Sequence, residues 1–119
     1  MTLASTLPEL VLAITGAGQG IGRGLALAFA RQGARAVVVA DINEQAAAKV
    51  AEEVRSLGCE ALAVGADVTR AADCAALVAQ AVQAFGRLDV MVCNAGIMQL
   101  RPLLELEAED WDRMLAVNV

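Results

Sequence analysis

The residues best suited to chemistry begin with a glycine-rich run, Thr15-Gly16-Ala17-Gly18-Gln19-Gly20-Ile21-Gly22. An apolar run, Leu10-Val11-Leu12-Ala13-Ile14, precedes it and a helical pattern follows it. Unpaired N–H groups at the start of a helix attract phosphate, and glycines let a phosphate approach the backbone closely. The segment therefore predicts a phosphate-binding turn between a strand and a helix.

The spacing of the glycines narrows the kind of phosphate site. Gly16, Gly20 and Gly22 follow G-x-x-x-G-x-G, whereas Ile21 stands where the pattern G-x-G-x-x-G has its third glycine. No Gly-Lys-Ser/Thr follows, so the pattern is not that of a P-loop. Asp41 ends a second apolar run at the offset, about 20 residues on, from which a carboxylate can bind the ribose of a dinucleotide. Together these features predict dinucleotide binding.

Three further polar residues are candidates, each with a plainer alternative. Asp67 follows the third apolar run, where it suits the adenine side of a dinucleotide or a simple turn or helix cap. Asn94 follows the fourth run and could face the ligand or only form a turn. Asn118 lies on the apolar face of the last helical pattern, so it is a functional amide, a buried satisfied amide or a frayed terminal residue.

Other reactive groups are few. The chain has no His and no Tyr, its one Lys is Lys49, and neither Ser5 nor Ser56 has a candidate base beside it. We expect Arg101 and Arg113 to belong to a solvated face. The three cysteines, Cys59, Cys74 and Cys93, are widely spaced, which predicts no metal site and a reduced, cytoplasmic setting.

Composition limits the classes of protein. At 119 residues and 58% hydrophobic, with 3% aromatic, the chain suits one domain of buried parallel strands under alanine-rich helices. A net charge of −5 without a basic cluster argues against nucleic acid and against an anionic membrane surface. No apolar stretch is long enough to span a bilayer, and Met1 to Pro8 lacks the features of a secretory signal.

The elements that position these residues alternate between strand and helix. Strands are expected at 10–15, 36–40, 61–65 and 88–93, and helices at 20–32, after Asn43, after Thr69 as a cap, and from about 108. The first helix is expected to bury Ile21, Leu25, Ala28 and Phe29. This alternation predicts an α/β fold, a Rossmann-type doubly wound parallel sheet of order 3-2-1-4, with its crevice between strands one and four.

As a set, these residues resemble the short-chain dehydrogenase/reductase family. The matches are Thr15-Gly16-x-x-x-Gly20-Ile21-Gly22, Asp41, Asp67-Val68, Asn94-Ala95-Gly96 and Val117-Asn118-Val119, in family order. The resemblance implies that the loop 16–22, which includes Gly18 and Gln19, holds the pyrophosphate of a nicotinamide cofactor. It implies that Asp41 binds the adenosine ribose, and that Asp67 and Val68 contact the adenine. Asn94, Ala95 and Gly96 would line the nicotinamide side, and Asn118 would be the catalytic Asn of a proton relay.

Two departures from the family pattern bear on activity. Cys93 stands where the family usually has a second Asn, a change that alters little in size. The family's catalytic Ser and its Tyr-x-x-x-Lys pair would follow Asn118, so we expect residues 1–119 to be the cofactor-binding half of such an enzyme, truncated before those groups. Two functions are then possible. The chain is the cofactor-binding half of an NAD-dependent oxidoreductase, which would act on an alcohol or carbonyl once completed, or it is a non-catalytic dinucleotide-binding module.

Two expectations concern ligand and partner. Asp41 favours NAD over NADP, because a carboxylate accepts bonds from ribose hydroxyls and repels a 2′-phosphate. Val90, Val92 and Cys93 give the fourth strand an apolar outer edge, and the last helix has an apolar face. Exposed apolar edges recruit other chains, so self-association is expected.

Overall fold

The computed structural model describes residues 7–119; Ser5 and most of the segment tested for a secretory signal lie outside the described residues. Four strands form one parallel sheet in the order β3-β2-β1-β4, which confirms the predicted fold class and strand order. The strands are β1 (Val11–Ile14), β2 (Ala36–Asp41), β3 (Glu60–Gly65) and β4 (Val90–Val92). A helix follows each of β1, β2 and β3, so the chain crosses from strand to strand as a Rossmann-type fold does.

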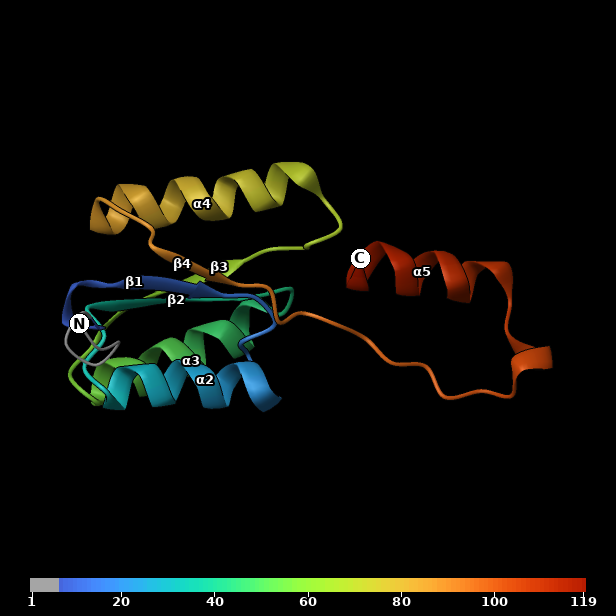
Figure 1. Ribbon diagram of the computed structural model, residues 1–119, viewed down its shortest axis with the longest axis horizontal. Helices are drawn as coiled ribbons and strands as arrows, with labels where there is room; N and C mark the ends of the chain where they lie inside the picture. Colours follow the sequence, from blue (N-terminus) through green and yellow to red (C-terminus); the bar gives the residue numbers. More distant parts are fainter. Residues whose placement is uncertain (1–6) are drawn as a thin grey trace.

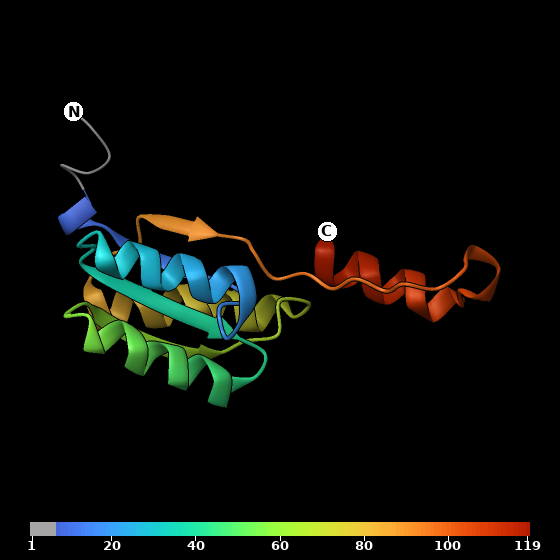
Figure 2. The same cartoon turned by 90° about the horizontal axis from the view of Figure 1, so that it is seen from below.

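Helices cover both faces of the sheet. Helices α2 (Gly20–Arg31) and α3 (Glu44–Ser56) pack on one face and α4 (Ala71–Phe85) on the other (Figures 1 and 2). Successive strand residues point to opposite faces, so Leu12 and Ile14 join the core under α2 and α3, whereas Ala13 joins the smaller core under α4. Burial on both faces explains why the strands are almost continuously apolar.

The buried face of α2 differs from the expected one. Ile21 is 78% exposed and Ala28 is also exposed, while Leu25 and Phe29 only border the core. The buried positions are instead Gly22, Ala26, Leu27 and Ala30. Three of these are small residues at four-residue spacing, which form a stripe that lets the helix axis approach the sheet closely. Leu25 and Phe29 therefore lie at the edge of the contact, whereas Leu27 remains buried.

The helix ends follow the expected rules with one exception. The Asn43 side chain caps α3 by accepting a hydrogen bond from the Ala46 N–H at 3.1 Å, as predicted. Thr69 does not cap α4, because its N–H and hydroxyl both donate to Asp67 Oδ1, at 2.9 and 2.6 Å. Arg70 takes the N-cap position without a side-chain bond, so that prediction was wrong.

After β4 the chain leaves the sheet as an arm, residues 97–119, that extends beyond the carboxyl ends of the strands (Figures 1 and 2). It contains the short helix η2 (Leu103–Glu105) and the helix α5 (Ala108–Asn118). A further short helix, η1 (Leu7–Glu9), precedes β1. None of the helices in residues 7–119 is both long and apolar enough to cross a membrane.

Candidate functional site: a cleft at the carboxyl ends of the strands

A cleft of about 590 Å³ lies where the carboxyl ends of the four strands meet the arm. Parallel strands bring the loops that follow them to one edge of the sheet, and ligands of such folds bind there. Among the residues predicted from the sequence, the cleft lining contains Gly16, Gln19, Gly20, Ile21, Asp41, Asp67, Val68, Asn94, Ala95 and Gly96. Gly18, Gly22 and Asn118 support this lining from behind or beside it.

The glycine loop connects β1 to α2 in a conformation that needs glycine. Gly16 and Gly20 have φ angles of 62° and 59°, which residues with a side chain rarely adopt. A Cβ on Gly22 would lie 2.5 Å from the Gly16 carbonyl oxygen, so the first turn of α2 fits against the loop only without one. The Gln19 side chain makes no capping bond. The N–H groups at the start of α2 therefore remain available to an anion in the cleft.

Asp41 is held at both carboxylate oxygens by backbone donors. The Gly18 N–H donates to Oδ2 and the Asn43 N–H donates to Oδ1, each at 2.9 Å. The two donors belong to different loops, one after β1 and one after β2. They fix the orientation of a negative charge at the cleft wall, while each oxygen keeps a lone pair for another donor.

Asp67 and Val68 line the cleft after β3. The Asp67 carboxylate accepts bonds from Thr69, as described above, and the pKa of Asp67 lies below its usual range because the Thr69 hydroxyl bonds to it. The Asp67 N–H donates to Asp73 Oδ2 at 2.9 Å, which ties this turn to the first turn of α4. The predicted turn role of Asp67 and its place in the cleft therefore coexist.

Asn94 joins the two loops on either side of the cleft. Its side-chain amide donates to the carbonyl oxygens of Thr15, at 3.0 Å, and Gly16, at 3.3 Å. In return, the Thr15 hydroxyl oxygen accepts from the N–H groups of Asn94, at 3.0 Å, and Ala95, at 3.1 Å. These reciprocal bonds hold the glycine loop against the segment after β4. A ligand in the crevice would lie across both segments.

The Asn118 side chain pairs with the backbone of the segment after β4. Its Oδ1 accepts from the Ile97 N–H at 2.8 Å, and its Nδ2 donates to the Ile97 carbonyl oxygen at 2.9 Å. A Cβ on Gly96 would lie 3.2 Å from the same Oδ1. Asn118 is thus a satisfied amide at the edge of the cleft, and Val117 beside it lines the cleft.

Among the residues of this site that sequence reasoning missed, three bear on its shape or charge. Thr15 was predicted only as part of the glycine motif, although its hydroxyl links the glycine loop to the segment after β4 by hydrogen bonds. Ile42, adjacent to Asp41, is 74% exposed and lines the cleft. Because Ile42 directly follows β2, the sequence could have indicated this position. Arg113 was expected on a solvated face; it is exposed but also lines the cleft, because the carboxyl-terminal end of α5 is the end nearer to the strand ends (Figure 1).

Comparisons with known proteins agree with this geometry. The family model described as short chain dehydrogenase matches residues 10–119. A hydroxynaphthalene reductase-like protein, Arp2, of Metarhizium anisopliae is 39% identical over 113 residues, which cover 95% of this chain and 42% of that protein. The chain therefore spans less than half the length of this curated relative.

Two solved structures are similar over the same part. A short-chain type dehydrogenase/reductase from Mycobacterium marinum superposes with a TM-score of 0.89 at 34% identity, covering 98% of this chain and 46% of that one. The 3-ketoacyl-(acyl-carrier-protein) reductase from Brucella melitensis, solved with NADH, gives a TM-score of 0.84 at 42% identity, covering 92% and 44%. With the family model matching nearly the whole chain, this protein belongs to the short-chain dehydrogenase family.

Proposed function

We propose that the chain binds a nicotinamide adenine dinucleotide in the cleft, as the cofactor-binding part of an oxidoreductase that interconverts an alcohol and a carbonyl. The observation that carries this proposal is that a glycine-rich loop and a carboxylate of fixed orientation lie at the same cleft. Gly16, Gly20 and Gly22 leave room and N–H groups for a pyrophosphate, and Asp41 presents its carboxylate at the same cleft. The relatives named as reductases and the neighbour solved with NADH support it.

Different residues would bind different parts of the cofactor. The N–H groups of Gly20, Ile21 and Gly22 would hold the pyrophosphate, and Asp41 would accept bonds from the adenosine ribose. Hydride chemistry would come from the nicotinamide of the bound cofactor. Asn94, Ala95 and Gly96 would form the wall beside that ring, and Asn118 would hold this wall in place through Ile97.

Asp41 also leads us to propose a preference for NAD over NADP. Its carboxylate can accept bonds from both ribose hydroxyls of NAD, whereas the 2′-phosphate of NADP would bring two negative charges together. Arg113 is the only cation among the described cleft residues, and it lies on the arm rather than on the loops around Asp41. The loss of one charged hydrogen bond is worth about 1.5–3 kcal/mol, which is at least about tenfold in affinity.

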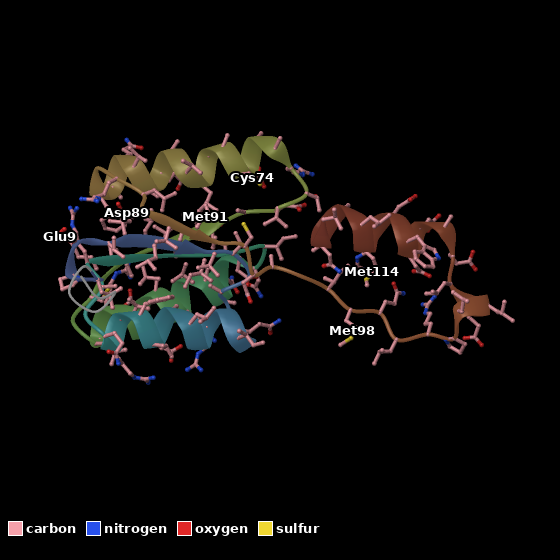
Figure 3. All side chains as sticks on the ribbon, in the orientation of Figure 1. Glu9, Cys74, Asp89, Met91, Met98 and Met114 are labelled. Atoms are coloured by element: carbon pink, nitrogen blue, oxygen red, sulfur yellow. The ribbon has the colours of Figure 1, made fainter. Side chains whose placement is uncertain are left out.

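Calorimetric titration of NAD and NADP into the chain tests both statements. We expect NAD to bind at least about tenfold more tightly than NADP, and Asp41→Asn to remove most of that difference. Glu9→Gln is the control, because it removes one negative charge at the opposite end of the sheet from the cleft (Figure 3). Absence of binding of either cofactor would overturn the proposed function, and equal or tighter binding of NADP would overturn only the preference.

Turnover is a separate expectation for these 119 residues. A positioned acid–base group contributes about 10²–10⁴-fold to such reactions, and the Tyr that the family resemblance implies in this role is not in the chain. We therefore expect cofactor binding without reduction of a panel of ketones above the rate of free cofactor. Purified activity at an enzymatic rate would show that another group supplies the proton.

A further inference from the structure

We infer that Gly18 sets the position of the Asp41 carboxylate and is thereby a positioning residue for the choice between NAD and NADP; this inference rests on the proposed function. Gly18 is not part of the cleft lining, so it would act through Asp41 rather than on a ligand. Its N–H donates to Asp41 Oδ2 at 2.9 Å, one of the two backbone bonds that orient the carboxylate.

The space beside Gly18 is filled by two side chains. A Cβ on Gly18 would lie 2.8 Å from Asp41 Oδ2, 2.9 Å from Asp41 Cγ and 2.9 Å from the Ala46 Cβ. All three distances are shorter than ordinary contacts, so something must move. Gly18 is not among the glycines with positive φ, so alanine suits its backbone and the contacts alone oppose a side chain there.

Asp41 is the group that would yield. Ala46 is fixed by the first turn of α3, where its N–H bonds to the capping Asn43 side chain. The Asp41 side chain, in contrast, can rotate about two bonds and swing its carboxylate away. Such rotation would break the Gly18 N–H bond and withdraw the acceptor from the position that a ribose would occupy.

Gly18 also borders a second depression, which is separate from the cleft. This depression has a volume of about 290 Å³ and is lined by Gly18, Arg23, Lys49 and Glu53, among others. Arg23 is paired with Glu53, whereas Lys49 makes no ion pair within residues 7–119. Displacement of the carboxylate would weaken binding of the ribose diol of NAD. It would also lessen the repulsion of the 2′-phosphate of NADP, and Lys49 is a cation near Gly18 that could attract that phosphate. Both effects lower the preference for NAD.

The test compares Gly18→Ala with Gly24→Ala, using the dissociation constants of NAD and NADP from calorimetric titration. Gly24 is an exposed glycine within α2, and a Cβ there would have nothing within 4 Å. We expect Gly18→Ala to weaken NAD by about tenfold and to lower the NAD preference by at least as much, the equivalent of one charged hydrogen bond. Gly24→Ala should leave both constants unchanged.

A double-mutant cycle with Asp41→Asn separates positioning from general damage to the loop. If Gly18 acts through Asp41, Gly18→Ala will not change the cofactor ratio once Asp41 is Asn. If it only distorts the loop, both cofactors will weaken equally in both backgrounds, and the inference is overturned. Should Gly18→Ala not fold, the pair Gly18→Ala with Ala46→Gly removes the contact with α3 and should show the same fall in ratio.

The same titrations test the proposed function and the role of Gly18 separately. A wild-type chain that binds neither cofactor contradicts the proposed function itself. A wild-type chain that prefers NAD, together with a Gly18→Ala variant of unchanged ratio, contradicts only the role assigned to Gly18.

Discussion

Among single residues, Thr15 carries the most connections between the two sides of the cleft. It is the only buried polar residue in the described part of the chain, at 7% exposure. Its hydroxyl accepts from two N–H groups after β4, and it donates to the Val92 carbonyl oxygen at 3.4 Å. The Thr15 side chain therefore positions the glycine loop against the end of β4, together with the Asn94 side chain.

Replacement of Thr15 by Val should destabilise the fold because it keeps the shape and removes the shared acceptor. The Ala95 N–H would lose its partner in a partly buried place, at a cost of about 1–3 kcal/mol, while the Asn94 N–H would keep its 3.0 Å bond to the Val92 carbonyl oxygen. Urea denaturation measures this loss, and Thr15→Ser, which keeps the hydroxyl, is the control. Equal stability of Thr15→Val and wild type would show that the Ala95 N–H finds another partner.

Some of these residue roles follow from the sequence and some do not. The glycines and Asp41 were predictable because a parallel sheet brings the residues after its strands to one edge, whatever the details of packing. The hydrogen bonds of Thr15 were not, because its partners lie 79 and 80 residues away and depend on the register of β1 against β4. The pairing of Asn118 with Ile97, 21 residues apart, likewise needed the path of the arm.

Among the elements, α5 is fastened to the rest of the arm at both ends. Asn118 binds Ile97 at its carboxyl end, and at its amino end Asp110 completes a capping box with Glu107. Asp110 also accepts from Gln99 at 2.9 Å and from Arg101 at 3.3 Å. Met98 and Met114, on the two facing parts of the arm, are labelled in Figure 3. These bonds hold α5 beside residues 97–101.

Acid should loosen the amino end of α5 through Asp110. The Glu107 N–H and the Gln99 side chain bond to its carboxylate and hold the pKa of Asp110 below its ordinary value of 3.8. The stabilisation from a lowered pKa is complete above the unfolded value and is lost as pH falls through the folded one. The Glu107 amide resonance should therefore titrate with a midpoint below 3.8.

Nitrogen–proton correlation spectra recorded from pH 6 to pH 2 would follow this titration at Glu107 and Gln99. Asp110→Asn is the control, because an amide oxygen can still accept the bond but does not titrate over this range. A midpoint at or above 3.8 in the wild-type chain would mean that the capping box is not formed in solution.

The helices show which features of an element a sequence pattern predicts and which it does not. The predicted positions of α3 and its Asn43 cap were correct because capping is a local interaction. The buried face of α2 was wrong because hydrophobicity favours large residues such as Ile21, whereas close packing on a sheet selects the small ones, Ala26 and Ala30. The helix cap could thus be predicted from neighbouring residues. How closely α2 packs on the sheet could not.

At the scale of the whole molecule, the chain is less compact than its length allows. Its radius of gyration is 15.5 Å, against about 13.5 Å expected for a compact domain of this size. The arm accounts for the excess, since it extends away from the sheet in both views (Figures 1 and 2). Among the described residues, apolar surface is open at the edge of β4 and on the α5 face that contains Trp111 and Leu115, which are 52% and 57% exposed.

We expect the chain to associate through β4. Within residues 7–119 this strand pairs with β1 on one side only, so the N–H and C=O groups of its other side can pair with a second copy. Met91, in the middle of β4, is 36% exposed, so Met91→Lys would place a charge on the edge and oppose strand pairing. Sedimentation equilibrium over a range of concentrations should give a mass above 12.3 kDa for the wild-type chain and a lower average mass for the variant.

Leu104→Lys is the matched control for this prediction, because Leu104 is 98% exposed on the arm and far along the chain from the β4 edge. A charge there should leave association unchanged if copies meet through β4. If Leu104→Lys lowers the mass and Met91→Lys does not, the arm is the contact, and the apolar face of α5 becomes the surface to vary next. A monomer of 12.3 kDa at all concentrations would show that one open edge of three residues is too short to recruit a second copy.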